Sequence, residues 1–95
     1  MKPHQGRRFD RAQLPAPAAY FRGQDINLRG GGEWLSALCP FHDDSNPSLR
    51  VRLDSGGYRC MACNAKGGNV LDFHMRLHRL TFVDAAKDLG AWRPK

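Results

Sequence analysis

Hydrophobic and polar residues alternate over residues 26–39, and this period of two predicts a pair of strands. Three consecutive glycines, Gly30–Gly32, lie in the middle of the stretch. Because glycine reaches positive φ without steric cost, we expect the turn of a first β-hairpin there. Two other segments predict irregular loops: residues 40–48 are rich in Asp, Asn, Ser and Pro, and residues 64–69 are rich in Gly, Asn and Lys.

A second hairpin is predicted directly after the first loop. Leu49, Val51 and Leu53 alternate with two arginines, so one face of this strand is apolar and the other is cationic. Asp, Ser and two glycines at residues 54–57 predict the turn, and residues 58–60 form the returning strand. The two hairpins together predict a small antiparallel sheet.

Two short helices are predicted in the C-terminal third of the chain. Asn69 is typical of a helix N-cap, and Asp72 stands in the first turn. One apolar stripe follows the helical period: Val70, Phe73, Leu77 and Leu80. Thr81 and Asp84 predict the start of a second helix, and Gly90 predicts its end. The expected architecture is therefore α+β, an antiparallel β-sheet of two hairpins with one or two C-terminal α-helices.

The N-terminal residues 1–19 differ from the rest, because they hold three prolines, scattered basic residues and few large apolar side chains. This composition predicts a mobile basic Pro/Ala-rich arm, with a short helical turn at residues 18–22. We expect the ordered part of the chain to begin near Ile26. The predicted division is the arm, one domain over residues 20–92, and a tail over residues 93–95.

Composition indicates a single small basic domain. The 95 residues carry 15 Lys and Arg against 9 Asp and Glu, a formal net charge of +6. This balance favours an acidic partner such as nucleic acid. No apolar run approaches the length of about 20 residues that spans a bilayer. The N-terminus also has no apolar segment typical of a secretory signal, and we expect no membrane partner. Three cysteines cannot all pair within one chain, which favours a cytoplasmic protein that uses thiols for metal or redox chemistry rather than for disulfides.

The central motif consists of two ligand pairs. Cys39-x-x-His42 is followed after 17 residues by Cys60-x-x-Cys63. Each pair brackets a tight turn, and the hairpin between them returns the chain to its start, so four ligands converge tetrahedrally. Thiolate and imidazole suit Zn²⁺, and a domain with fewer than about 80 ordered residues gains stability from such a staple. We expect one structural zinc ion.

Two other ligand sets remain open. Cys60 and Cys63 followed by His74 and His78 are typical of a two-Cys, two-His finger, although only 10 residues separate Cys63 from His74 where about 12 are usual. The two histidines are also spaced for a second metal, but the segment between them lacks the glutamate of a metalloprotease helix. Partly exposed helix histidines are the more common interpretation of such a pair. No βαβ pattern surrounds the cysteine pair, which argues against a redox role.

Two runs of sequence carry a resemblance to a known family: ALCPFHDDSNPSL at residues 37–49 and YRCMACNAKGGNVLDF at residues 58–73. Together with residues 80–89, they resemble the N-terminal zinc-binding domain of bacterial DnaG-type DNA primases, over about residues 26–90. The resemblance implies a small zinc ribbon with four ligands: Cys39, His42, Cys60 and Cys63. It further implies a sheet face that contacts single-stranded template DNA during primer initiation.

The sequence departs from that family in two respects. In those primases a catalytic TOPRIM domain with acidic Mg²⁺ ligands follows, whereas the acids Asp43, Asp44 and Asp54 of this chain lie in predicted turns. A Pro/Ala-rich arm also takes the place of the helix that precedes the first hairpin. We therefore expect zinc and DNA binding, but no catalysis by this chain alone.

The predicted DNA contacts lie on the cationic strand face. Basic side chains there contact phosphates, and exposed aromatic rings stack on bases. The candidates are Arg29, Trp34, Arg50, Arg52, Tyr58, Arg59 and Lys66. Trp34 and Tyr58 either stack on bases or pack in the core, whereas Phe41 is expected in the core. Basic residues of the arm add a diffuse, salt-sensitive contribution: Arg7, Arg8 and Arg11.

Three functions fit these features. The first is a non-catalytic zinc ribbon that binds single-stranded DNA in primer synthesis or DNA replication, with a primase, a helicase or another replication protein as partner. The second is the zinc-binding subunit of a primase enzyme whose catalytic TOPRIM part is a separate chain. The third is a protein-interaction adaptor, in which zinc is only structural and the basic face binds an acidic partner.

Overall fold

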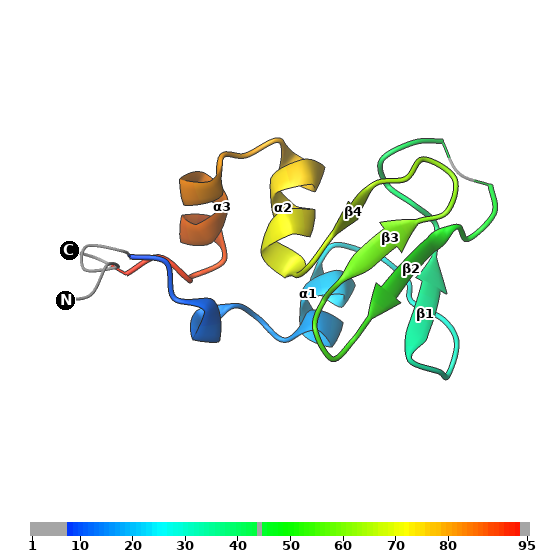
Figure 1. Cartoon of the computed structure of the whole chain (residues 1–95), viewed down its shortest axis with the longest axis horizontal. Helices are drawn as coiled ribbons and strands as arrows, with labels where there is room; N and C mark the ends of the chain where they lie inside the picture. The colour runs from blue at the N-terminus through cyan, green and yellow to red at the C-terminus, as the bar shows by residue number, and fades with distance from the viewer. Residues whose placement is uncertain (1–7, 44, 94–95) are drawn as a thin grey trace.

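Four short strands form one antiparallel sheet in the computed structural model, which describes residues 8–43 and 45–93. The order in the sheet follows the chain (Figure 1). The strands are β1 (Trp34–Ala37), β2 (Leu49–Arg52), β3 (Tyr58–Cys60) and β4 (Lys66–Gly67). The α-helices are α1 (Pro17–Gly23), α2 (Val70–His78) and α3 (Phe82–Asp88). The expected fold class, a small antiparallel sheet with C-terminal helices, is confirmed.

The central hairpin forms as its alternation predicts. Leu49 and Val51 are fully buried, while Arg50 and Arg52 lie half-buried on the opposite face of β2. The prediction that Leu53 lies on the apolar face of this strand is wrong, because the strand ends at Arg52 and Leu53 is exposed in the turn. The alternation therefore predicts burial correctly only for residues within the paired strand.

The first hairpin is only half formed. Its second half is β1, but its first half meets β1 only through Arg29, whose backbone exchanges two hydrogen bonds of 2.8 Å with Ser36. Ile26 is buried, and its backbone N–H donates to the carbonyl of Phe21 at 3.0 Å. Because Ile26 is held at the end of α1, residues 26–28 do not align along β1.

The strand β4 corrects the prediction of a loop over residues 64–69. Lys66 pairs with Arg59 and Gly67 pairs with Tyr58. A two-residue strand has no alternation for sequence analysis to detect. Gly67 is required at this edge, since a Cβ there would lie 2.5 Å from Cε1 of Tyr58 and 2.6 Å from Cβ of Asp72.

The helix α1 corrects two expectations about the N-terminal part. Pro17 stands at the first helical position, where its missing N–H costs nothing. Tyr20 and Phe21 of this helix are buried in the core. Order therefore begins before Ile26, contrary to the prediction. The helical turn predicted at residues 18–22 does form, as α1, so a helix precedes the sheet and is not replaced by an arm. The proline and alanine content was typical of an arm, but here it starts a helix.

The two C-terminal helices begin at the predicted caps. The side chain of Asn69 accepts a hydrogen bond from the backbone N–H of Asp72 at 3.0 Å, and Thr81 accepts from that of Asp84 at 3.1 Å. Such caps satisfy backbone donors that the first turn of a helix leaves unpaired. After α3, Gly90 adopts a φ of 77°, which explains why the helix ends there.

The core has two parts. In the larger one, rings of α1, α2 and β3 meet edge to face, with Phe73 4.8 Å from Phe21 and 4.9 Å from Tyr58 between ring centroids. Aromatic pairs favour this arrangement, and the buried residues of β2 pack against the same cluster. A smaller apolar cluster joins α2 to α3: Leu71, Ala85 and Ala86.

Both ends of the described chain lie at the helical end of the molecule, away from the sheet (Figure 1). Phe9 forms an antiparallel bridge with Trp92, and the backbone N–H of Arg93 donates to the carbonyl of Arg8 at 2.6 Å. A 3-10 helix follows at Arg11–Gln13. Several predicted features lie outside the described residues: arm residues 1–7 with Arg7, Asp44, and tail residues 94–95. The division into arm, domain and tail remains a prediction.

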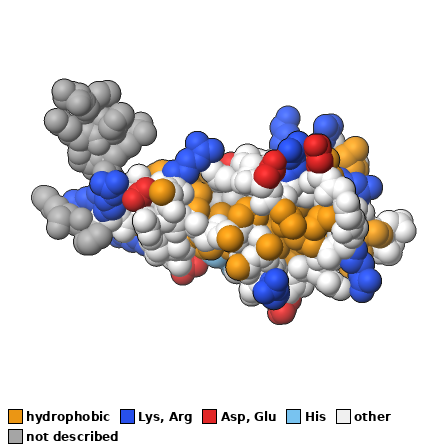
Figure 2. Space-filling view, turned by 90° about the horizontal axis from the view of Figure 1, so that it is seen from below, with side chains coloured by type: hydrophobic (Ala, Val, Ile, Leu, Met, Phe, Trp, Pro, Cys, Tyr) orange, Lys and Arg blue, Asp and Glu red, His pale blue; other side chains and the backbone are white. Residues whose placement is uncertain are grey.

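Seen from below, hydrophobic side chains reach the surface in the middle of the molecule, with Lys and Arg near its margins (Figure 2). A hollow of 240 Å³ between α1 and the sheet is lined partly by Leu28, Leu35 and Leu53. Within the part of the chain that the structure describes, no helix is both long and apolar enough to cross a membrane.

Candidate metal centre and cationic sheet face

The four predicted metal ligands come together beyond the ends of the central strands. Cys39 follows β1, His42 lies in the next turn, Cys60 ends β3, and Cys63 lies in the turn before β4. Their ligand atoms, three Sγ and one imidazole nitrogen, all lie within 4.8 Å of one another. Because β2 and β3 pair directly, the hairpin between the two motifs closes the site as the spacing predicts.

Two of the distances between ligand atoms match a single tetrahedral zinc ion. Cys39 Sγ lies 3.9 Å from Cys63 Sγ, and Cys60 Sγ lies 3.4 Å from His42 Nε2. With Zn–S near 2.3 Å and Zn–N near 2.0 Å, tetrahedral geometry requires about 3.8 Å between sulfurs and about 3.5 Å between sulfur and nitrogen. The four side chains are therefore positioned to bind one zinc ion, as predicted.

Hydrogen bonds to the sulfur atom of Cys60 favour its thiolate form, the form that binds a metal. The backbone N–H groups of Ala62 and Cys63 donate to Cys60 Sγ at 3.4 Å, and the hydroxyl of Ser48 lies 3.5 Å away. Burial alone would raise the pKa of Cys60, but these hydrogen bonds outweigh burial and lower its pKa well below the usual thiol value.

Cys39 has the opposite electrostatics. Burial raises the pKa of its thiol, and the hydrogen bond from the backbone N–H of Phe41 offsets only part of that effect. A bound dication stabilises the thiolate form directly, so zinc binding at this site releases a proton. The thiolate form of Cys39 is therefore stabilised by the bound metal rather than by groups of the protein.

The alternative ligand set with His74 and His78 does not form. His74 is buried between three helices, where its Nδ1 lies 2.7 Å from the hydroxyl of Tyr20 and its Nε2 lies 2.5 Å from Asp88. His78 is exposed and lies 2.9 Å from the side-chain oxygen of Gln24. The expectation of partly exposed helix histidines is thus wrong for His74, because the sequence did not reveal that α1 and α3 cover it.

Strand pairing places four predicted DNA-binding residues in one row across the sheet. Arg29 lies opposite Ser36, Ser36 opposite Arg50, Arg50 opposite Arg59, and Arg59 opposite Lys66. Directly opposite residues project from the same sheet face, and like charges there destabilise the pairing. We call Arg29, Arg50, Arg59 and Lys66 the cationic row. Among the described residues, none of the four forms an ion pair with a carboxylate.

Trp34 and Arg52 form a pair beside the cationic row. They are opposite in the sheet register, and the Arg52 guanidinium carbon lies 5.5 Å from the centre of the Trp34 ring. Trp34 keeps 44% of its surface exposed. Arg52 also binds Asp54 through two hydrogen bonds of 2.7 and 3.1 Å, and it lies 3.6 Å from Glu33. Arg52 is therefore already neutralised, unlike the cationic row.

The remaining aromatic candidates belong to the core. Tyr58 is only 3% exposed, and its ring packs against Phe73, so it offers no open face to a base. Phe41 is half-buried against the same two rings, as expected. The sequence analysis missed Arg76, whose Nε donates to the Tyr58 hydroxyl at 3.3 Å. Its place on α2, three residues after Phe73, was the only available signal.

Comparison with known proteins finds one family for most of the chain. The model of the CHC2 zinc finger, the DnaG zinc ribbon, matches residues 19–93. The DNA primase of Staphylococcus epidermidis is 42% identical over 65 residues, which cover 68% of this chain and 11% of that protein. The DNA primase of Streptomyces coelicolor is 35% identical over 80 residues, covering 84% of this chain and 12% of that protein.

A solved structure shares the fold. The crystal structure of the zinc-binding and RNA polymerase domains of Aquifex aeolicus primase superposes with a TM-score of 0.68 at 24% identity. The match covers 80% of this chain and 18% of that one. The chain therefore spans little more than a tenth of the length of the primases that it matches in sequence.

Proposed function

Because this chain belongs to the CHC2 zinc-finger family, the zinc ribbons of DnaG-type primases, we propose that it binds single-stranded template DNA on the open face of its sheet. In this proposal it acts in the cytoplasm during primer synthesis, together with other replication proteins, and has no catalytic activity of its own. The zinc ion holds the ends of the central hairpin and so maintains the sheet that carries the DNA.

The cationic row is the observation that carries the proposal. Arg50, Arg59 and Lys66 lie directly opposite one another on neighbouring strands, which costs stability unless an anion neutralises them. Phosphates of a nucleic acid strand supply such anions at regular intervals. Arginine also binds a phosphate with two hydrogen bonds at once. The row therefore fits an extended phosphate backbone better than a single small anion.

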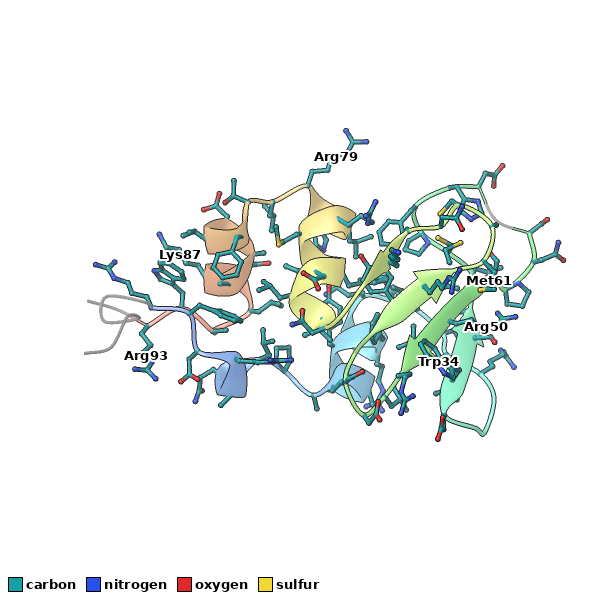
Figure 3. The ribbon with its side chains drawn as sticks, viewed as in Figure 1. Trp34, Arg50, Met61, Arg79, Lys87 and Arg93 are labelled. Carbon is teal, nitrogen blue, oxygen red and sulfur yellow. The ribbon has the colours of Figure 1, made fainter. Side chains whose placement is uncertain are left out.

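Exposed apolar side chains beside the row support a single strand rather than a duplex. Figure 3 places Trp34, Arg50 and Met61 together at the sheet end of the molecule. Trp34 and Met61 are 44% and 57% exposed. Unpaired bases stack on such surfaces, whereas a duplex presents mainly its phosphates. The adaptor function would not require exposed aromatic surface next to arginines without a carboxylate partner.

The test compares two double variants that remove the same charge. Arg50→Gln with Arg59→Gln removes two members of the cationic row, and Arg79→Gln with Lys87→Gln removes two exposed cations at the helical end (Figure 3). Fluorescence anisotropy with labelled single- and double-stranded oligonucleotides is measured over a range of salt concentrations. The row variant should lose affinity and lower the slope of log K against log salt by about 1.4, roughly 0.7 per lost phosphate contact.

The matched control should retain most of its affinity. Equal losses in both double variants would show that only net charge matters and would reject the cationic row as the binding surface. No preference for single strands would reject the template assignment. Priming assays with the chain alone, and with a catalytic primase fragment added, separate a non-catalytic DNA-binding module from the subunit of a two-chain primase.

A further inference from the structure

A hollow of 530 Å³ lies where the edge strand β4 meets α2. Neither the metal centre nor the middle of the cationic row uses it. The hollow is wide and open to solvent, so a ligand there would rest against one wall and stay partly exposed. It is lined by Tyr58, Lys66, Gly67, Asp72, Met75, Arg76 and Leu80. These residues come from β3, β4, α2 and the segment before α3. In Figure 1, β4 lies beside β3 and leads directly into α2.

Arg76 is held in place on the helix side of the hollow. Its Nε donates to the Tyr58 hydroxyl at 3.3 Å, and its guanidinium carbon lies 5.7 Å from the ring centre of Phe41. Since Tyr58 and Phe41 belong to the core, they restrain the guanidinium before any ligand arrives. Among the described residues, Arg76 forms no ion pair with a carboxylate. A restrained arginine without a counter-ion binds an anion at low entropic cost.

Lys66 supplies a second positive charge on the strand side. It is exposed and stands directly opposite Arg59, so it is both the last member of the cationic row and a wall of the hollow. A strand that follows the row across the sheet therefore arrives at the hollow. Two cations facing one space are typical of a site for phosphate.

The other walls show that inorganic phosphate alone does not match the hollow. Asp72 carries a negative charge, and its Oδ2 accepts a hydrogen bond from the backbone N–H of Gly68 at 2.8 Å. A carboxylate repels a phosphate but accepts hydrogen bonds from a sugar hydroxyl or from the amino group of a base. Met75 and Leu80, both half-buried, add apolar surface. A nucleotide carries all of the matching groups.

We propose that this hollow binds one nucleotide, with its phosphate between Lys66 and Arg76 and its nucleoside toward Asp72, Met75 and Leu80. The nucleotide is either a free nucleoside 5′-triphosphate or the terminal nucleotide of a strand bound on the cationic row. The inference rests on the proposed function, because the cationic row is what brings a strand to the hollow.

The experiment titrates the zinc-loaded full chain with four probes and follows backbone amide chemical shifts by NMR. The probes are ATP, inorganic triphosphate, and one oligonucleotide with and without a 5′-phosphate. If the source is a free nucleotide, ATP should bind at least about tenfold more tightly than inorganic triphosphate. If the source is a strand end, the 5′-phosphate should increase oligonucleotide affinity by a similar factor.

The variant Arg76→Gln should abolish whichever of these two differences is present. Lys66→Gln tests the same site from the sheet edge and does not alter the contact to the Tyr58 hydroxyl. It should reduce the same affinity difference. Lys87→Gln, which removes one exposed charge on α3, is the matched control and should change neither difference. Zinc content of each variant reports whether the fold persists.

The outcomes separate this inference from the proposed function. Absence of both differences, or their survival in the folded variants Arg76→Gln and Lys66→Gln, overturns the nucleotide site. If Arg50→Gln with Arg59→Gln leaves DNA binding intact while the Arg76→Gln effect persists, the cationic row is rejected but the nucleotide site stands. If the row variant loses DNA binding and Arg76→Gln changes nothing, the cationic row stands and the nucleotide site is rejected.

Discussion

The sheet end and the helical end of this molecule are stabilised in different ways. At the sheet end, strands of two to four residues are closed by four side chains that are positioned to bind one zinc ion. At the helical end, α2 and α3 share a small apolar cluster and are joined to α1 by buried Tyr20 and His74, which hydrogen-bond to each other, and by exposed Asp88, which contacts His74. One end depends on an ion, and the other depends on packing and hydrogen bonds.

The two ends also treat charge differently. At the helical end, Arg93 forms an ion pair with Asp10, and Nε2 of His74 lies 2.5 Å from Asp88. At the sheet end, the cationic row accumulates like charge without a carboxylate partner among the described residues. Under the proposed function, the anion that neutralises the row is the phosphate backbone of a bound strand. The following predictions test this contrast, from the largest effect to the smallest.

Removal of zinc should have the largest effect. Zinc contributes an apparent 10–16 kcal/mol or so in finger peptides, which is as large as the whole stability of a typical domain, about 5–15 kcal/mol. We expect a strong chelator, or Cys60→Ser, to unfold the sheet end and to abolish DNA binding. Circular dichroism and metal analysis on the same sample provide the measurement. A Cys60→Ser protein with a full equivalent of zinc would reject the ligand assignment.

His74→Ala should destabilise the helical end strongly while zinc remains bound. The substitution leaves a cavity and removes the partner of the buried Tyr20 hydroxyl. We expect a loss of about 2–4 kcal/mol in the free energy of unfolding. Urea denaturation and metal analysis check the two halves of this prediction. Loss of zinc would favour the rival ligand set, and no loss of stability would show that the helical end does not depend on this histidine.

Tyr20→Phe should have a smaller effect at the same place. It keeps the buried ring but removes the hydroxyl that lies 2.7 Å from Nδ1 of His74. One buried polar atom then loses its partner, which costs about 1–3 kcal/mol. Urea denaturation measures the change, and the zinc content should stay at one equivalent. A stability equal to that of the unchanged protein would show that the Tyr20–His74 contact contributes nothing.

Asp54→Asn should have the smallest effect on stability and a distinct effect on binding. Hydrogen bonding to Arg52 lowers the pKa of the exposed Asp54 carboxyl, and the two groups neutralise each other. The variant removes the nearer of the two carboxylates beside Arg52 and leaves Glu33 at 3.6 Å, so affinity for single-stranded DNA should rise by about a few-fold. Ser55→Ala, in the same turn, is the control without a charge change. Unchanged affinity for DNA would place Arg52 outside the binding surface.

Features that depend on nearby residues were predicted correctly from the sequence. The caps at Asn69 and Thr81 act within three residues, so the starts of α2 and α3 were correct. The ligand spacing was sufficient because each pair of ligands brackets one turn. The first hairpin was wrong in its first half, because Ile26 is held by Phe21, and no feature of residues 26–28 themselves indicates that contact.

The sequence alone was enough to predict the four residues that are positioned to bind zinc and the strand face that carries arginine, because both depend on patterns within a few residues. The tertiary structure was needed to show that Arg29, Arg50, Arg59 and Lys66 form one row, since they come from different segments whose register depends on strand pairing. It likewise decided that Tyr58 and His74 are buried. Burial depends on packing between segments that are distant in the chain, and local periodicity does not encode such contacts.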